Sequence, residues 1–502
     1  MKYGNISTGS EEASLAAKEI LKFGGNAFDA AVSAIFVSMT SEFALTGAFG
    51  GGTLLGIQRN ADPFIYDFFV DSPINTNKNK EFININVDFG ETSQKFNIGK
   101  GSIATPGNLM GLIEIQKKYG VLNINDVLQN AIYIANHGVN ITSYQGYILS
   151  LIKPILKFDD YTKKLLFKKN KLINKGDTFK NPEFGNFLSL LLKEGYDYFY
   201  KGEGLNTILK FLDNKSNLTK NDFINYKIYK REPQSINFNN HMIYTNSSPS
   251  HGGPLIVFLL KLLKKSNLEI NNDNLINAMN ITSQARQNIC LNPDIENEIN
   301  QIFIDKNFKY FLSEFKKSNL NFSKSKDGFG STTHVSIIDK MGNAASITTT
   351  NGEGCGYIIP EYGIMMNNML GEHDLNPFGF HKWNKKRRLP TMMSPTIITQ
   401  NSRAKYILGS GGSNRIRSAN IQVILNLLLK NMNLSDAINA PRIHLESNTL
   451  FHEPGVLIPN EKLKNVIINS FHEKNLFFGG VNAVSENLAV GDSRRGGHGI
   501  VC

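Results

Sequence analysis

Cysteine is scarce in this sequence, and its scarcity excludes two ways of stabilising a fold. Only Cys290, Cys355 and Cys502 occur in 502 residues, and their wide spacing suits neither a disulfide framework nor a zinc site. Cys355 lies in the glycine-rich stretch Asn351–Gly356, where either a nucleophilic thiol or an ordinary loop cysteine would fit. We expect stability to come from a large core, because 41% of the residues are hydrophobic.

Long apolar runs are also missing. The longest apolar stretches, Ala30–Val37 and Pro254–Leu260, are well short of a membrane-spanning helix, which needs ~18–20 residues. The start of the chain, Met1–Ser7, has no basic region followed by an apolar one, so no secretory signal is expected. These absences predict a cytoplasmic protein that does not bind a membrane.

Acidic residues are fewer than basic ones, which gives a formal net charge of +11 and an isoelectric point near 9.2. The lysines are interleaved with asparagine and isoleucine, as in residues 153–175, rather than concentrated in one motif. No zinc-finger, RNA-recognition or basic-zipper pattern accompanies them, so nucleic-acid binding is not expected. The excess charge favours an anionic small-molecule substrate instead, because the summed charge of a protein steers ligands.

A glycine cluster near the N-terminus lacks the other residues of a phosphate-binding loop. Gly50–Gly52 precede a short apolar stretch, but the Lys-Ser or Lys-Thr ending of a Walker motif is absent. Consecutive glycines predict instead that the backbone approaches another segment closely or adopts positive φ.

Apolar periodicity predicts helices in much of the chain. Residues 10–24 begin with Ser-Glu-Glu and end in glycine, and Asn26 caps a second, alanine-rich helix. Other segments share the helical spacing of apolar residues: 112–118, 125–137, 187–193 and 419–429.

The clearest β-hairpin is residues 332–350, whose strands meet at the turn 339–343. The preceding stretch 319–326 is polar and is expected to be exposed or mobile, so a loose segment ends at a strand that begins with Thr332. Further short strands beside small or polar clusters are predicted at 363–368, 394–398 and 406–413. Layers of sheet covered by helices are the expected architecture.

Thr332 lies where a self-contained nucleophile could be generated. An N-terminal threonine carries a hydroxyl and an α-amine that can accept its proton, directly or through water. The reference pKa of that amine, about 7.7–8.0, leaves a useful basic fraction near neutral pH. The same hydroxyl can first cut the chain by attacking the carbonyl of Ser331 in an N-to-O acyl shift, after which water releases the ester. A threonine pair at a strand start is also common for β-propensity alone.

Eight separated motifs occur along the chain. They are Gly24–Val32, Gly50–Thr53, Ala104–Gly107, Thr332–Asp339, Gly363–Asn368, Met393–Thr396, Gly409–Ile416 and Asp492–Gly497. In type and order these motifs resemble those of the γ-glutamyltranspeptidase family of N-terminal-nucleophile hydrolases, and they span nearly the whole chain.

The resemblance implies an α+β architecture, the four-layer αββα sandwich of N-terminal-nucleophile hydrolases. It also implies one precursor that is cut between Ser331 and Thr332 into segments 1–331 and 332–502, which stay intertwined in one αββα unit. Thr332 matches the nucleophile of the family. An acyl group would pass to its Oγ, the amine would depart, and water or an acceptor amine would take the acyl group. No cofactor or metal is implied.

Two further features match catalytic groups of the family. Thr350 matches a second threonine whose hydroxyl supports the nucleophile, although Thr348 or Thr349 would also fit. Gly411 and Gly412 match adjacent glycines whose backbone N–H groups form an oxyanion hole, each donor being worth roughly 3 kcal/mol. A purely structural glycine turn is the alternative.

The substrate-facing positions match less closely. Asn367 and Asn368 match positions near the substrate pocket, although either amide could instead satisfy buried backbone. Glu372 matches an acidic residue that binds a substrate amino group, or it is a surface carboxylate. Thr391 and Met392 stand where relatives carry two serines near the substrate carboxylate, and methionine cannot donate that hydrogen bond.

An arginine is missing from the expected place. Typical members use an arginine before the segment matching Thr105–Gly107 to clamp the substrate α-carboxylate, for which its planar fork is suited. This chain has no arginine between Arg59 and Arg231, and the corresponding region is Tyr66–Pro73. The resemblance therefore implies a γ-glutamyltransferase-like or glutathione hydrolase-like enzyme that cleaves a γ-glutamyl or related small acyl amide.

Two other hypotheses rest on particular features. Glu372, His373, Asp374 and His381 could be drawn as metal ligands, although their spacing matches no common motif. An unprocessed, non-catalytic homologue that binds a small amino-acid-like ligand is the other alternative. The presence of Thr332 and of its partner groups argues against that alternative.

Overall fold

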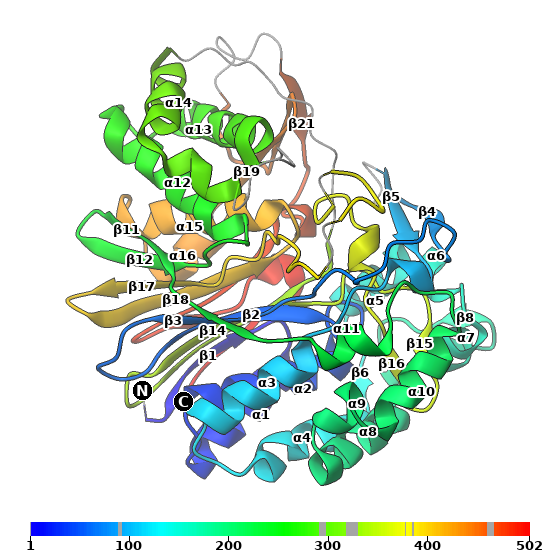
Figure 1. The fold of residues 1–502 in the computed structure, drawn as a ribbon. Helices are drawn as coiled ribbons and strands as arrows, with labels where there is room; N and C mark the ends of the chain where they lie inside the picture. The colour runs from blue at the N-terminus through cyan, green and yellow to red at the C-terminus, as the bar shows by residue number, and fades with distance from the viewer. Residues whose placement is uncertain are drawn as a thin grey trace.

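The computed structural model describes residues 2–88, 93–290, 298–317, 330–376, 378–383, 386–458 and 466–502. The predicted exposed segment 319–326 lies outside the described residues. Two β-sheets lie face to face at the centre of the molecule, and helices cover both outer faces (Figure 1). This arrangement confirms the predicted four-layer αββα sandwich.

The first sheet has seven antiparallel strands in the order β10-β3-β2-β14-β13-β1-β24. Their bounds are β1 Gly4–Thr8, β2 Gly51–Ile57, β3 Phe64–Phe68, β10 Tyr229–Arg231, β13 Thr333–Asp339, β14 Ala344–Thr350 and β24 His498–Val501. The predicted hairpin, β13 and β14, lies at its centre between β1 and β2. Strands of the predicted segment 332–502 therefore lie between strands of segment 1–331.

The second sheet has six antiparallel strands in the order β11-β12-β17-β18-β22-β23. Their bounds are β11 Gln234–Phe238, β12 His241–Thr245, β17 Thr396–Gln400, β18 Arg403–Gly411, β22 Gly480–Ser485 and β23 Ala489–Val490. Strands β13 and β14 pack on β18, and β13 also packs on β22. Apolar side chains fill the space between the sheets, among them Leu55, Ile338, Ile397 and Ile407.

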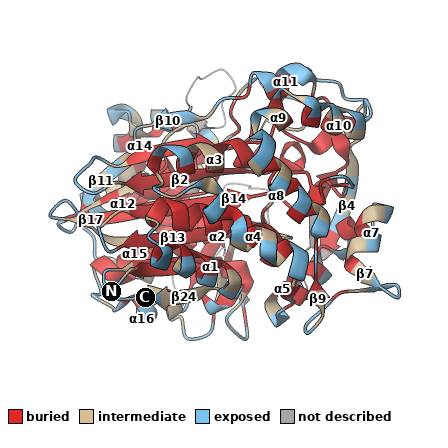
Figure 2. Cartoon of the chain, turned by 90° about the horizontal axis from the view of Figure 1, so that it is seen from below, coloured by how far each residue is buried: buried red, intermediate tan, exposed pale blue. Residues whose placement is uncertain are grey.

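Helices form the two outer layers. The face of the first sheet is covered mainly by α1 Glu11–Phe23, α2 Ala27–Ser41, α3 Asn108–Tyr119, α4 Ile124–His137 and α8 Pro182–Glu194. The face of the second is covered by α12 Gly252–Ser266, α13 Asn272–Ala285, α14 Asp305–Lys317, α15 Arg415–Leu428 and α16 Leu434–Asn439. Helix α2 is buried along its whole length between the sheet and the outer helices (Figure 2). The helices predicted from apolar spacing are confirmed.

The remaining elements lie beside this core. The helices are α5 Ser143–Leu151, α6 Lys153–Leu156, α7 Asp160–Leu166, α9 Asp197–Tyr200, α10 Glu203–Leu212 and α11 Lys220–Ile224. The short strands are β4 Ile83–Asp88, β5 Ser93–Ile98, β6 Val139–Asn140, β7 Phe167–Lys168, β8 Lys171–Leu172, β9 Thr178–Phe179, β15 Ile358–Ile359, β16 Ile364–Met365, β19 Ile443–Glu446, β20 Thr449–His452 and β21 Ile467–Ser470. None of the helices in the described part of the chain has the length and apolar composition that crossing a bilayer requires.

Local sequence signals explain where the first helices begin and end. The Ser10 side chain accepts a hydrogen bond from the Ala13 N–H, and Gly24 ends α1 with φ of 105°. Asn26 and Asp29 form a reciprocal capping box at the start of α2. These caps satisfy backbone groups that a helix end leaves without partners.

The glycine cluster at residues 50–52 serves close packing, as predicted. A Cβ atom on Gly50 would lie 2.1 Å from the carbonyl oxygen of Thr350, and one on Gly52 would lie 2.8 Å from that of Thr348. A larger residue would push β2 away from β14. The cluster therefore brings the N-terminal part of the chain against the end of the central hairpin.

Candidate active site

Thr332 lies immediately before β13 and is buried, with 5% of its surface exposed. The hairpin register pairs Thr333 with Thr349 and Ile338 with Ala344. Ser331 and Thr332 are joined here, so the contacts described below surround the peptide bond that is predicted to be cut.

The Ser331–Thr332 junction is held by the residues that follow β14. The Thr350 hydroxyl donates a hydrogen bond to the carbonyl oxygen of Ser331. The Thr350 Oγ1 in turn accepts a hydrogen bond of 3.0 Å from the Gly352 N–H. The Ser331 N–H donates to Glu353 Oε1 at 3.0 Å. Both backbone groups of Ser331 are thus fixed by one short segment.

The three threonines at the end of β14 have different partners. The Thr348 hydroxyl shares a hydrogen bond of 2.8 Å with His334 Nδ1, and the Thr349 hydroxyl shares one of 2.9 Å with Thr46. Burial lowers the pKa of His334 to about 3, so this imidazole is neutral. Only the Thr350 hydroxyl contacts the Ser331 carbonyl among the described hydrogen bonds. The geometry favours Thr350 over its neighbours for the predicted supporting role.

Gly411 and Gly412 are brought to the same place by the end of β18. A Cβ atom on Gly411 would lie 2.2 Å from the carbonyl oxygen of Thr332. Gly412 has φ of 120°, a left-handed conformation that favours glycine. No described residue accepts a backbone hydrogen bond from the Gly412 N–H. The oxyanion-hole function stays a prediction, and the close backbone approach that it requires is present.

Three acidic residues gather beside this junction. Glu353 is 3% exposed, and no described residue donates to its Oε2 or to Glu372 Oε1. Burial raises the pKa of Glu353 to about 8. Burial, with repulsion from Glu353 and Asp374, raises the pKa of Glu372 well above its usual value. Glu372 is therefore not a freely solvated surface carboxylate.

The amide side chains of Asn367 and Asn368 are occupied by backbone groups. Asn367 Nδ2 donates to the carbonyls of Phe49 and Ala104, and its Oδ1 accepts from the Ala104 N–H. Asn368 Oδ1 accepts a hydrogen bond of 3.0 Å from the Glu353 N–H. The structure thus supports the structural alternative for Asn367, and it places Asn368 behind the Glu353 loop rather than directly on a ligand.

Thr391 and Met392 contact the start of α12 and the core beneath it. The Thr391 carbonyl accepts hydrogen bonds from the N–H groups of His251 and Gly252, where α12 begins. Met392 is buried in the apolar core that α12 and α15 share. Their predicted place near a substrate carboxylate stays a prediction.

An arginine does reach the region where the sequence lacks one, and it comes from far along the chain. Arg388 Nε lies 3.1 Å from Asp71 Oδ1 and 3.6 Å from Asp67 Oδ1, and its Nη1 donates to Tyr226 Oη at 2.8 Å. The backbone of Asp71 bridges to Thr105, which begins the Thr-Pro-Gly motif. Because carboxylates already occupy Arg388, the geometry does not support a free carboxylate clamp at this position.

Two alternatives from the sequence do not fit the structure. Cys355 is fully buried in the core, and burial raises its pKa to about 12, so its thiol is a poor nucleophile. Among the described residues, no three His, Cys, Asp or Glu side chains converge as metal ligands. Asp374 instead accepts hydrogen bonds from Ser413 and Asn414, next to the glycine pair.

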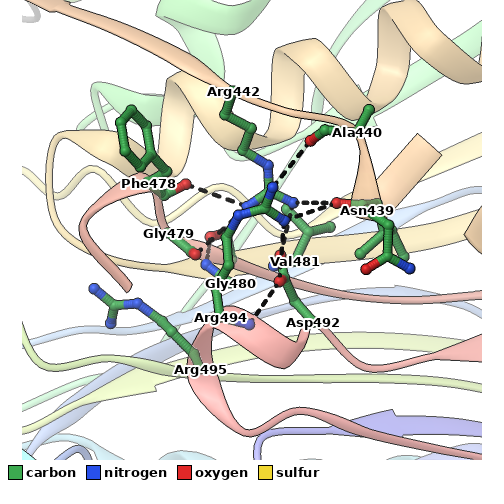
Figure 3. Close-up of polar contacts among 12 residues, drawn as sticks. Asn439, Ala440, Arg442, Phe478, Gly479, Gly480, Val481, Asp492, Arg494 and Arg495 are labelled. Carbon is green, nitrogen blue, oxygen red and sulfur yellow. Dashed lines mark hydrogen bonds and ion pairs between the residues drawn. The ribbon is translucent and has the colours of Figure 1, made fainter. Parts of the chain in front are cut away.

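The C-terminal motif builds a second cluster, in which each carboxylate is paired with an arginine (Figure 3). Arg442 donates to Asp492 at 2.6 Å, and Arg494 pairs with Glu453 at 2.5 Å and with Asp492 at 3.3 Å. Asp492 also accepts the Val481 N–H at 2.9 Å. These bonds anchor the end of β22, which pairs with β18 at the glycine pair.

Arg495 extends away from that cluster (Figure 3) and toward the glycine pair. A Cβ atom on Gly412 would lie 3.0 Å from its Nη2, and one on Gly411 would lie 3.4 Å from its Nη1. Sequence reasoning named the motif but not this side chain. It also missed Glu353, whose one signal was an acidic residue between two glycines, just after the supporting threonine.

The sequence is similar to one family along most of its length. The sequence model of the family described as gamma-glutamyltranspeptidase matches residues 13–502. The glutathione hydrolase proenzyme of Escherichia coli (strain K12) is 26% identical over 475 residues, which cover 88% of this chain and 81% of that protein. The acylase ACY 1 proenzyme of Pseudomonas sp. (strain SE83) is 27% identical over 511 residues, 96% of this chain and 90% of that protein. A crystal structure of cephalosporin acylase from Bacillus halodurans has the same fold, with a TM-score of 0.84 and 19% identity over 99% of this chain and 96% of that one.

Proposed function

Because the chain belongs to the γ-glutamyltranspeptidase family, we propose that it is a self-cleaving amidohydrolase or acyltransferase whose nucleophile is Thr332. The observation that carries this proposal is the junction itself. The Ser331 carbonyl oxygen accepts a hydrogen bond from the Thr350 hydroxyl, while the backbone of Gly411 lies close to the Thr332 carbonyl. Groups from β14 and β18 thus surround one peptide bond, and that bond precedes a threonine.

Maturation follows from this geometry. Thr332 Oγ attacks the carbonyl carbon of Ser331, and the Thr350 hydroxyl stabilises the negative charge that develops on the carbonyl oxygen. The C–N bond breaks, and the Thr332 nitrogen takes the proton that its hydroxyl loses. Water then hydrolyses the ester, which leaves a carboxylate on Ser331 and a free α-amine on Thr332. No group outside the chain, apart from water, is needed.

Turnover repeats the same chemistry on an external amide. The Thr332 hydroxyl attacks the substrate carbonyl while its own amine accepts the proton and passes it to the leaving amine. The N–H groups of Gly411 and Gly412 would hold the oxyanion, in the water-poor setting where such donors contribute most. Water, or an acceptor amine, then removes the acyl group from the Oγ.

The acyl group is proposed to be small and to carry an amino group. Glu372 places a carboxyl oxygen without a described partner beside the junction, whereas Arg388 is already paired with Asp67 and Asp71. Relatives named glutathione hydrolase and acylase suggest γ-glutamyl amides, with other small acyl amides as the second class to test. The net charge of +11 would favour anionic substrates at long range, and a cytoplasmic location stays a prediction.

The test is the intact mass of the purified chain under denaturing conditions, beside its Thr332→Ala variant. Division of the 56.0 kDa chain after Ser331 would give fragments of about 37 and about 19 kDa. The wild type should give this pair, and the variant should stay whole. If the wild type also stays whole after long incubation, the proposal fails, and the alternative of a non-catalytic binding protein takes its place.

A further inference from the structure

We propose that Glu353 is a positioning residue for self-cleavage. Its carboxyl group holds the Ser331 N–H and so orients the carbonyl that Thr332 attacks. This inference rests on the proposed function, because it assigns a role within the cleavage reaction of the same site. Glu353 contacts Ser331, the residue on the acyl side of the bond, and acts through it.

The first argument is that Ser331 is held at both of its backbone groups. Its N–H donates to Glu353 Oε1 at 3.0 Å, and its carbonyl accepts from Thr350. The two hydrogen bonds hold the successive peptide groups on either side of the Ser331 Cα, which restricts rotation about the Ser331 backbone and keeps its carbonyl beside Thr332. Small errors in the placement of reacting atoms, of about 1 Å, can slow a reaction by about 100-fold. Loss of one of the two anchors should therefore slow the attack.

The second argument is that the loop is built to aim this side chain. Gly352 and Gly354, on either side of Glu353, have φ of 62° and 83°, which other residues adopt at a cost. The Glu353 N–H donates to Asn368 Oδ1 at 3.0 Å. A Cβ atom on Gly352 would lie 2.1 Å from that same oxygen and 2.3 Å from Glu372 Oε1. The turn therefore requires glycine in order to present Glu353 to Ser331.

The third argument is that Glu353 is not placed to stabilise the fold. It is 3% exposed, and no described residue donates to its Oε2. A buried carboxyl group with unused hydrogen-bonding capacity is unfavourable. The charged groups that face it are Glu372 and Arg495. Among the described contacts, neither of these forms an ion pair with it, so its position is better explained by its contact with Ser331.

The protonation state gives the proposal a distinctive signature. Burial raises the pKa of Glu353 to about 8, so the group is neutral at pH 7 and Oε1 still accepts the Ser331 N–H. Ionisation would add negative charge close to the carbonyl oxygen that becomes negative during attack. Arg495 offsets part of that charge, whereas Glu372 adds to it. Self-cleavage should therefore slow as the pH rises through about 8.

The experiment compares rates of self-cleavage after cell-free synthesis, with samples quenched at intervals and analysed by denaturing mass spectrometry. The chains are the wild type, Glu353→Ala, Glu353→Gln and Glu361→Ala, a control at an exposed glutamate between β15 and β16. At pH 7, Glu353→Ala should be slower by about tenfold or more, because one anchor is lost. Glu353→Gln should stay within about threefold of the wild type, because its amide oxygen can accept the same N–H. The decline above pH 8 should disappear in Glu353→Gln and persist in Glu361→Ala.

The outcomes separate the two proposals. If the wild type does not cleave, the proposed function fails. If the wild type cleaves and Glu353→Ala cleaves equally fast, only the role of Glu353 is overturned. The role of Glu353 is also overturned if both Glu353 variants cleave equally slowly while they keep the wild-type circular dichroism spectrum and a cooperative thermal transition. If Glu353→Ala does not fold, the pH profile of Glu353→Gln decides: a flat profile supports the role, and a profile parallel to that of the wild type overturns it.

Discussion

Two groups of acidic side chains lie near the glycine pair Gly411–Gly412, and they are built differently. In the C-terminal cluster, Asp492 and Glu453 are both paired with arginines, and Asp492 also accepts a backbone N–H. Beside Thr332, Glu353 and Glu372 each keep a buried oxygen without a described partner. One group uses burial to strengthen ion pairs, and the other leaves carboxyl groups unpaired.

The difference shows in how the carboxyl groups titrate. Arg442 and Arg494 keep the pKa of Asp492 below its usual value against the opposing effect of burial. Burial without such a partner raises the pKa of Glu353 to about 8. Paired burial makes removal of one partner costly, while unpaired burial destabilises the fold until a ligand or a reacting group uses it. The first cluster is thus a structural support, and the second is the group to which we assign a role in the proposed reaction.

The largest expected effect is on the paired cluster. Asp492→Asn would leave Arg442 and Arg494 buried without their shared carboxylate, and we expect a loss of about 3–5 kcal/mol in the free energy of unfolding. Urea denaturation in the Thr332→Ala background measures it on an uncut chain. A loss smaller than 1 kcal/mol would show that the cluster is not a major support.

The next effect is on cleavage rather than on stability. Thr350→Val removes the hydroxyl that donates to Ser331 but keeps the shape, so self-cleavage should slow by about 10- to 100-fold. The melting temperature should change little. Thr349→Val is the matched control, because its hydroxyl bonds to Thr46 instead. Equal rates in the two variants would remove the distinction drawn between these threonines.

A smaller effect is expected in how the thermal stability depends on pH when the unpaired Glu372 is replaced. The pKa of Glu372 in the folded chain is above its unfolded value, so its contribution to stability is complete at acidic pH and is lost as the pH rises toward the folded pKa. Glu372→Gln should therefore raise the melting temperature at pH 9, by about 2–4 °C, and raise it less at pH 5. Calorimetry of both chains in the Thr332→Ala background tests this sign. A gain that is larger at pH 5 would contradict it.

The smallest effect is expected at an exposed pair. Asp160 and Lys163 lie 2.7 Å apart on α7, and the Asp160 side chain is almost fully exposed. Water and salt screen such a pair, so Asp160→Asn should leave the melting temperature unchanged within error. A clear destabilisation would mean that pairing alone, rather than pairing with burial, explains the behaviour of Asp492.

Local signals in the sequence predicted much of the frame. The caps at Ser10 and Asn26, the alternation of the central hairpin and the position of Thr332 at its start all depend on neighbours within a few residues. Such features can be recognised because the physical partners are close in the chain. The glycines predicted that the backbone approaches another segment closely, but they did not predict that this segment is β14.

The features that sequence reasoning missed depend on distant partners. The sequence before Thr105 contains no arginine, and only the fold brings Arg388 beside Asp71 from far along the chain. The core neighbours of Met392 likewise come from segments far apart in the chain. Asn367 has all of its hydrogen-bonding capacity engaged by backbone groups of other segments.

The sequence by itself determined the family, the four-layer fold and the threonine at which the reaction is expected to begin. The tertiary structure alone decided which groups hold the Ser331–Thr332 bond, because hydrogen bonds and burial depend on distances between segments that the chain order does not contain. It also decided which buried charges are paired. Glu353 and Asp492 are both acidic residues beside glycines or arginines in the sequence, and only their surroundings make one a reactive-site group and the other a support.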